Sequence, residues 1–427
     1  MSEQHQDHIA EVRQFFWRNY VSHSIEGGLF IGGMAFLAGD TVMPSMIKSL
    51  GGPEWLIALM PVIMSLGFML PQLLTAHRVE QLQWVKPFVM FTGIFQRTPY
   101  LAAALALFLL AGTHPMLTLA IVAATPLVGG IAGGLSFSAW IELISKIIPE
   151  RRRSSAWAVR YIIGAAIGIG AGSVIRSVLR DHPGPAGYAM LHLHASAFLW
   201  LSYLAFAAIR ETRKPPGIIA TPRGLHENLR SLPHLLRSDI QLRRFLGMRV
   251  CGLGLNIMIP FLAIYALRVT GHDESFLGHF VTAQMTGGII GNLLAGYLGD
   301  RYGGKLPVFI GRVLLLALSI AAVVNRSETG FVVIYFTLGF AVFLENVGAT
   351  TLSIELCPHD RRPTYMAFIS AVIMPCTLLA AAVSTVVRVA TGGIALAAAL
   401  SAALLALSFY FLVRLREPRH TRAAAAS

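Results

Sequence analysis

Long apolar runs alternate with short polar turns along the whole chain. Each run is close to the roughly 20 residues that an α-helix needs to cross the ~30 Å hydrocarbon core of a bilayer. The apolar residues are continuous and do not alternate with period two, which excludes a membrane β-barrel. We therefore predict an all-α integral membrane protein with twelve transmembrane helices in two pseudo-symmetric six-helix bundles.

The predicted spans fall into two groups that the longest polar stretch separates. The first group comprises residues 19–47, 55–75, 87–111, 116–148, 155–178 and 188–209. The second group comprises residues 246–268, 276–298, 306–324, 330–356, 364–390 and 393–413. The polar stretch between them has leucines at helical spacing with arginines in between, which predicts an amphipathic helix on the membrane surface.

This pattern predicts five parts of the chain. They are an amphipathic N-terminus (1–18), an N-terminal six-helix bundle (19–210), a central loop with an amphipathic helix (211–243), a C-terminal six-helix bundle (244–413) and a tail (414–427).

Composition and charge agree with a membrane protein. Charged residues make up 13% of the chain, whereas they make up about 25% of soluble domains. The formal net charge is +13, which we ascribe to orientation in the membrane, so that no nucleic-acid partner is expected. On the predicted topology, 27 Lys and Arg residues lie on the side of the termini and 6 on the other side. The positive-inside rule then places both termini in the cytoplasm, and we expect the bacterial inner membrane.

Two short patterns recur in the second half of the chain. Residues 149–153 (PERRR) match residues 358–362 (PHDRR), and the turn at 76–87 matches the turn at 296–307. The matches occur in the same order and each lies between two apolar runs. They indicate an internal repeat of two six-span halves.

The turn Gly296-x-x-x-Asp300-Arg301-x-Gly303-x-Lys305 resembles the short-loop signature of the major facilitator superfamily. The twelve spans, the two halves and the basic central loop fit that superfamily too. The resemblance implies that two bundles rock around a central cavity in alternating access. It also implies a gating role for the turn and its counterparts. These residues are Gly296, Asp300, Arg301, Lys305, Glu80, Arg152 and Arg361.

Charged residues inside apolar runs are candidates for solute or proton binding, because each costs about 2.5–3.5 kcal/mol to insert into a membrane. Glu26, with His23 one turn before it, is the first candidate for a proton or cation site, and a structural ion pair is the alternative. Arg97 is interpreted as the only arginine fully inside a span, which makes it a candidate for anion binding. In the superfamily, the seventh, eighth and tenth helices line the cavity. Their candidate residues here are Asn256, Gln284, Asn292 and Glu345.

Two further features are interpreted as structural. We predict that Glu142 in the fourth span pairs with Arg160, or alternatively with Arg97, because an ion pair would satisfy both buried charges. Asn256 and the nearby Pro260 predict a locally broken helix that exposes backbone groups to a ligand.

The sequence predicts a secondary transporter that moves a small solute by alternating access, driven by a proton gradient or another gradient. There is no Gly-x4-Gly-Lys-Ser/Thr loop for ATP, and no cofactor is expected. His192 and His194 are two positions apart on a helix and do not share a face, so no metal site is expected. The expected partners are the lipid bilayer, a small-molecule solute and protons, and the chain is expected to be a monomer.

Two other classes of protein are weighed. A transporter-like sensor or scaffold would often carry an added soluble domain. A membrane-embedded, lipid-modifying enzyme would need acids or histidines clustered at one membrane interface. Neither feature is found. An enzyme is therefore not expected, and a transporter-like sensor or scaffold remains the main alternative to a transporter.

Overall fold

The computed structural model describes residues 3–79, 82–212, 239–356 and 362–417. Within these residues the regular elements are helices. Two predicted gating residues, Glu80 and Arg361, lie outside the described residues. The same is true of residues 213–238, which make up most of the predicted central loop, and of residues 418–427 in the tail.

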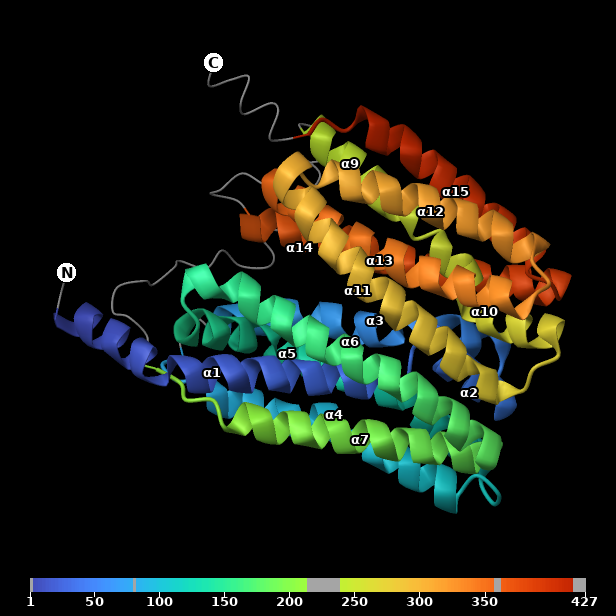
Figure 1. Cartoon of the computed structure of the whole chain (residues 1–427), viewed down its shortest axis with the longest axis horizontal. Helices are drawn as coiled ribbons and strands as arrows, with labels where there is room; N and C mark the ends of the chain where they lie inside the picture. The colour runs from blue at the N-terminus through green and yellow to red at the C-terminus, as the bar shows by residue number, and fades with distance from the viewer. Residues whose placement is uncertain (1–2, 80–81, 213–238, 357–361, 418–427) are drawn as a thin grey trace. The chain divides into compact units, whose positions relative to one another are not determined.

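The helices follow the predicted spans (Figure 1). In the first part of the chain they are α1 (Glu3–Ala35), α2 (Val42–Ser49), α3 (Glu54–Val79), α4 (Lys86–Leu109), α5 (Pro115–Ile147), α6 (Glu150–Asp181) and α7 (Pro185–Ala207). In the second part they are α9 (Ile240–Gly252), α10 (Leu255–Thr270), the short 3-10 helix η1 (Glu274–Phe276), α11 (Leu277–Tyr302), α12 (Lys305–Val324), α13 (Glu328–Leu356), α14 (Arg362–Thr391) and α15 (Ala395–Arg414).

Two of the predicted spans are broken into two helices each. In the first span, α1 ends at Ala35 and α2 begins at Val42. Pro44 explains this break, because in a continuous helix its ring would clash with the backbone of Asp40. In the seventh span, Gly252 ends α9 and Gly254 lies in the break before α10. Glycine is the residue that disfavours helix most after proline. The predicted break near Asn256 is therefore present, just before that residue.

Eight helical segments within the described residues are long and apolar enough to cross a membrane. They are 115–147, 156–181, 185–207, 240–270, 305–324, 328–353, 372–391 and 395–414. The chain is therefore an integral, multi-pass membrane protein. The count of twelve transmembrane helices stays a prediction.

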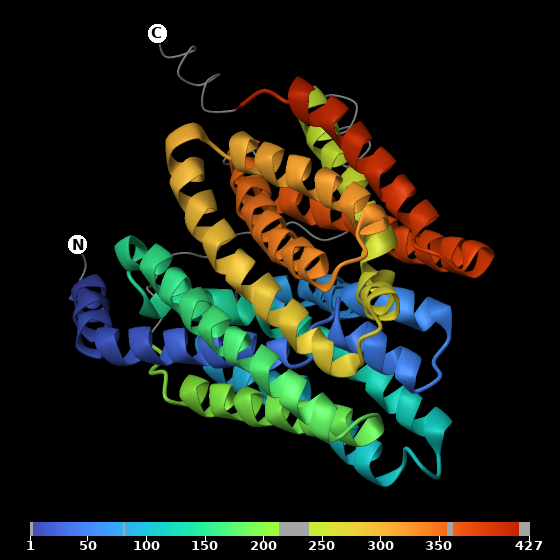
Figure 2. The same ribbon diagram turned by 45° about the vertical axis from the view of Figure 1, so that its right-hand side comes forward.

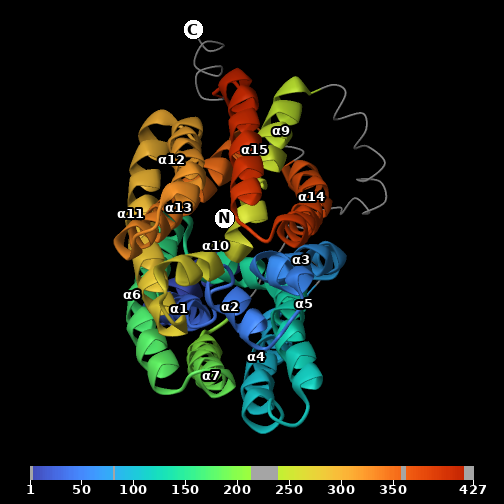
Figure 3. The ribbon, with the colours of Figure 1, turned by 90° about the vertical axis from the view of Figure 1, so that its right-hand side faces the viewer.

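The chain divides into two compact units. The first comprises Met1–Ala38, Ile63–Ala171 and Asp181–Leu225, and the second comprises Gly39–Val62, Gly172–Arg180 and His226–Ser427. Within the first unit, α4 packs against α5 and α7, and α7 packs against α1 (Figure 1). Within the second unit, α11 and α12 pack against α13, while α15 packs against α9, α10 and α12 (Figures 2 and 3).

Glycines in α11 determine how closely it approaches α13. A Cβ atom at Gly287 or Gly291 would collide with the backbone carbonyl oxygens of Phe336 and Phe340. Small residues allow this close approach of helix backbones in membranes, where packing drives association. The glycine pattern of the eighth predicted span thus has a packing function in the second unit.

A buried carboxylate joins the end of α7 to the start of α4. The Glu211 carboxylate accepts hydrogen bonds from the backbone N–H groups of Val85 and Lys86, each at 2.9 Å, and from Lys146 Nζ at 2.9 Å. Lys86 Nζ in turn donates to the carbonyl oxygen of Ala207 at 2.8 Å. We call Glu211, Lys86 and Lys146 the N-terminal clasp.

The same arrangement joins the end of α15 to the start of α12. Glu417 accepts a hydrogen bond from the backbone N–H of Lys305 at 3.1 Å. Lys305 Nζ donates to the carbonyl oxygens of Val413 at 3.2 Å and Leu415 at 2.7 Å. Gly303 has φ of 86° and lies so close to Glu417 that a Cβ atom would overlap the carboxylate. We call Glu417 and Lys305 the C-terminal clasp. Its likeness to the N-terminal clasp supports the internal repeat, and it shows that Lys305 connects α12 to the end of α15.

Replacement of Glu211 by Gln should destabilise the first unit. It leaves the ammonium of Lys146, only 3% exposed, without its partner, and breaking a buried ion pair in this way costs about 3–5 kcal/mol. We expect a clear fall in the melting temperature of the purified protein in detergent. Glu328→Gln is the matched control, because the side chain of Glu328 is 57% exposed and its loss should leave the melting temperature nearly unchanged. Equal melting temperatures for Glu211→Gln and the wild type would contradict the clasp.

Candidate functional site

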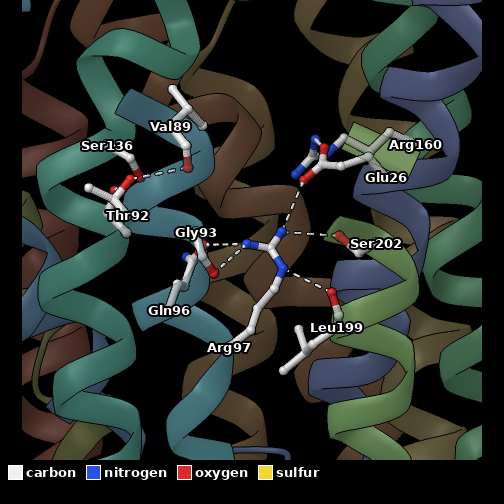
Figure 4. Close-up of polar contacts among 11 residues, drawn as sticks. Glu26, Val89, Thr92, Gly93, Gln96, Arg97, Ser136, Arg160, Leu199 and Ser202 are labelled. Carbon is white, nitrogen blue, oxygen red and sulfur yellow. Dashed lines mark hydrogen bonds and ion pairs between the residues drawn. The ribbon is translucent and has the colours of Figure 1, made fainter. Parts of the chain in front are cut away.

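Three ionised side chains meet inside the first unit. Glu26 on α1 accepts a hydrogen bond from Arg160 Nη1 on α6 at 2.7 Å, and Arg97 Nη2 on α4 lies 3.9 Å from its other carboxylate oxygen. Their residues are 4%, 8% and 5% exposed, respectively. We call these three residues the Glu26 cluster (Figure 4). Because water barely reaches them, each charge depends on the others for its stabilisation.

Backbone and hydroxyl groups hold the Arg97 guanidinium in place (Figure 4). Arg97 Nε donates to the carbonyl oxygen of Leu199 at 2.8 Å, and Nη1 donates to that of Gly93 at 3.1 Å. Nη2 lies 3.3 Å from Ser202 Oγ. Arg97 therefore links α4 to α7 as well as contributing positive charge beside Glu26.

A glycine makes room for the ion pair between Glu26 and Arg160. A Cβ atom at Gly27 would overlap the Arg160 side chain. The absence of a side chain at this position lets Arg160 reach Glu26 across the contact between α1 and α6. The contact with Arg160 thus explains why glycine, and not a larger residue, follows Glu26 in the sequence.

Aromatic rings surround the Arg160 guanidinium. Its Cζ atom lies 4.9 Å from the ring centre of Trp140 on α5 and 5.4 Å from that of Trp157 on α6. The imidazole of His23 is 5.8 Å from each of these rings. At these separations a cation is attracted to the faces of the indoles.

A second buried ion pair lies in the second unit. Arg312 Nη2 on α12 donates to Glu345 Oε1 on α13. Within the described residues, Arg312 Nε and Nη1 and Glu345 Oε2 are buried without a hydrogen-bond partner. Arg249 on α9 interacts electrostatically with both residues. A Cβ atom at Gly252 would overlap the Arg312 guanidinium, so the break between α9 and α10 also makes room for an arginine.

The structure corrects two of the sequence interpretations. Arg160 pairs with Glu26, and among the residues that the structure describes no hydrogen bond or ion pair joins Arg160 to the predicted partner Glu142. Arg97 is not the only arginine inside a span, because Arg312 is 1% exposed within the apolar helix α12. The signal for Arg312 is present in the sequence, since this arginine stands alone in the apolar run 306–324.

The other predicted binding residues make no hydrogen bond to these ion pairs within the described residues. Gln284, which is buried, donates a hydrogen bond to Asp40 in the second unit. Asn256 is half-buried in the first turn of α10, and Asn292 is half-buried on α11. Within the described residues, no hydrogen bond or ion pair joins Asn256 or Asn292 to Glu345.

The predicted gating residues that the structure describes lie mostly on the surface. Gly296, Asp300 and Arg301 are exposed at the end of α11, where Arg301 Nη1 donates to the hydroxyl of Tyr297 at 3.1 Å. Arg152 is exposed in the first turn of α6. Their role in gating stays a prediction.

Comparison with known sequences gives a family and distant relatives. Residues 244–427 match the family model described as Major Facilitator Superfamily. Over 380 residues, which are 87% of this chain and 70% of the relative, the chain is 24% identical to uncharacterised proteins of Mycobacterium tuberculosis and Mycobacterium bovis. A stretch of 88 residues, 21% of this chain and 19% of the relative, is 31% identical to the 4-hydroxybenzoate transporter PcaK of Acinetobacter baylyi.

Solved structures of transporters have the same fold. The nucleoside transporter NupG has a TM-score of 0.68 at 16% identity, over 93% of this chain and 98% of that chain. The D-xylose-proton symporter has a TM-score of 0.70 at 12% identity, over 95% and 99%. The chain therefore has the fold that these transporter structures share. Residues 244–427, less than half of the chain, match the model of the major facilitator superfamily and resemble its members.

The pair of Arg312 and Glu345 should show non-additive stability. Arg312→Met or Glu345→Met alone leaves a buried charge without its partner, which costs about 3–5 kcal/mol, whereas replacing both with apolar residues is often neutral. We expect each single variant to lower the melting temperature and the double variant to recover most of the loss. A double variant whose loss equals the sum of the single losses would show that the two residues act independently.

Proposed function

We propose that this protein is a secondary transporter that moves a small organic solute by alternating access and couples this movement to protons. The observation that carries the proposal is Glu26, a carboxylate buried between two guanidinium groups within a membrane protein. Ionisable residues at this depth are costly and usually mark substrate, ion or proton pathways.

Glu26 is suited to couple a proton to a conformational change. The charged groups that face it are Arg160 on α6 and Arg97 on α4, and the titratable His23 on α1 lies beside Arg160. Protonation of Glu26 removes the charge that holds Arg160, so the link between α1 and α6 weakens. A ligand or proton shifts a conformational equilibrium only if it interacts differently with the two states, and this ion pair provides such a difference.

The relatives support an organic solute without fixing its identity. Their names specify 4-hydroxybenzoate, nucleosides and D-xylose as substrates, and one of them is a proton symporter. We further propose that residues 19–210 and 244–413 are the two bundles, that both termini are cytoplasmic in a bacterial inner membrane, and that the functional unit is a monomer.

Proteoliposomes that contain a pH-sensitive dye test the proposed function. We expect one member of a panel that includes 4-hydroxybenzoate, D-xylose and uridine to drive solute-dependent acidification. Glu26→Gln should abolish the acidification and the proton-driven accumulation, while exchange of labelled for unlabelled solute continues. If folded wild-type protein gave no solute-dependent flux with any compound, a sensor or scaffold would be the better account. If Glu26→Gln still accumulated solute against a gradient, Glu26 would not be the coupling residue.

Asp300→Ala tests the proposed gate at the end of α11. Asp300 is exposed, so its replacement should leave expression, membrane insertion and melting temperature close to those of the wild type. Loss of an interaction that stabilises one conformation should lower the rate of solute uptake several-fold. Unaltered uptake kinetics in the same proteoliposomes would remove Asp300 from the gating mechanism.

A further inference from the structure

The aromatic group around Arg160 extends beyond the two tryptophans. Ring contacts continue from Phe68 on α3 through Phe137 and Trp140 on α5 to Trp157 and Tyr161 on α6, with ring centres 5.0 to 6.0 Å apart. Tyr161 is 42% exposed and the two tryptophans are half-buried. The row therefore offers flat apolar faces that reach from a buried guanidinium towards the surface of the first unit.

The charge balance of the cluster determines the sign of a ligand. Glu26 contributes one negative charge, whereas Arg97 and Arg160 contribute two positive charges, which gives a net charge of +1 for these three residues. In a buried site of low dielectric constant, Coulomb interactions are much stronger than in water. A cationic solute would be repelled, and the aromatic faces that would suit an ammonium ion already hold the Arg160 guanidinium. An anionic solute would neutralise the remaining charge.

Donor groups remain for such an anion. Within the described residues, Arg160 makes one hydrogen bond, from Nη1 to Glu26, although a guanidinium carries five N–H donors in a planar fork that matches a carboxylate. His23 is fully buried, and neither of its ring nitrogens has a hydrogen-bond partner among the described residues. A buried polar group without a partner is destabilising, so a ligand that hydrogen-bonds to His23 is stabilised by satisfying it.

We propose that His23, Trp140, Trp157 and Arg160 bind a planar aromatic carboxylate, and this inference rests on the proposed transport function. Arg160 binds the carboxylate through the donors that Glu26 leaves free. Because the faces of Trp140 and Trp157 hold the Arg160 guanidinium, their indole rings contact the aromatic ring of the ligand in an edge-to-face arrangement. His23 hydrogen-bonds a polar substituent or the carboxylate.

Binding of four matched compounds to the purified full-length protein in lipid nanodiscs tests this site. Benzoate has both the charge and the ring, cyclohexanecarboxylate has only the charge, benzyl alcohol has only the ring, and benzylamine has the ring with the opposite charge. We expect calorimetry to give the tightest binding for benzoate, about tenfold weaker binding for cyclohexanecarboxylate and benzyl alcohol, and no binding of benzylamine. Equal affinities for benzoate and benzylamine would overturn the proposal.

Variants locate the binding. Arg160→Lys and Trp157→Phe should each weaken benzoate binding at least tenfold, while Trp55→Phe, an exposed tryptophan outside the aromatic row, should leave it unchanged. Arg160→Lys also alters the buried ion pair with Glu26. If this variant fails to fold, the benzoate affinity of Trp157→Phe alone tests the site. Unchanged benzoate affinity in a folded Trp157→Phe variant would overturn the site. If benzoate fails to bind while another solute drives proton flux, this inference fails and the transport function stands.

Discussion

The ion pair between Glu26 and Arg160 is the interaction on which the first unit and its proposed chemistry depend. A single charge inside a membrane span costs about 2.5–3.5 kcal/mol, so α1 tolerates Glu26 only because α6 and α4 bring guanidinium groups to it. Gly27 creates the space for this contact. The three residues that stabilise the packing of these helices are therefore the same residues that we propose respond to a proton or an anion.

The two units contain equivalent clasps. In the first unit, the carboxylate of Glu211, just after α7, accepts a hydrogen bond from the start of α4, and a lysine there donates to a carbonyl oxygen at the end of α7. In the second unit, Glu417 and Lys305 make the same contacts between α15 and α12. The equivalent helices α4 and α12 each also carry a buried arginine, Arg97 and Arg312 respectively. The partner carboxylates differ in origin, because Glu26 lies on α1 whereas Glu345 lies on α13. The repeat thus maintains the framework while the charged sites have diverged.

Much of this could be predicted from the sequence, because a lone charge or a glycine pattern in an apolar run is visible without a structure. The all-helical membrane fold, the resemblance to the major facilitator superfamily, and the buried positions of Glu26 and Glu345 follow from the sequence. The pairing of charges could not be predicted, because several helices offer cations at similar depth, and so Glu142 was chosen where Glu26 is the partner of Arg160. Lys305 is predicted as a gating residue because it belongs to the turn that resembles the superfamily signature. Its contact with Glu417 could not be predicted, because Glu417 lies far along the chain, where no local pattern indicates it.

A double-mutant cycle on Glu26→Gln and Arg160→Gln tests the central claim most directly. Melting temperature and initial rate of solute uptake would be measured for the wild type, both single variants and the double variant, all in the same lipid. Because the pair acts as one unit, the account predicts that the second substitution adds little to the first in both measurements. Losses that add independently in stability and in uptake would contradict a functional ion pair between α1 and α6.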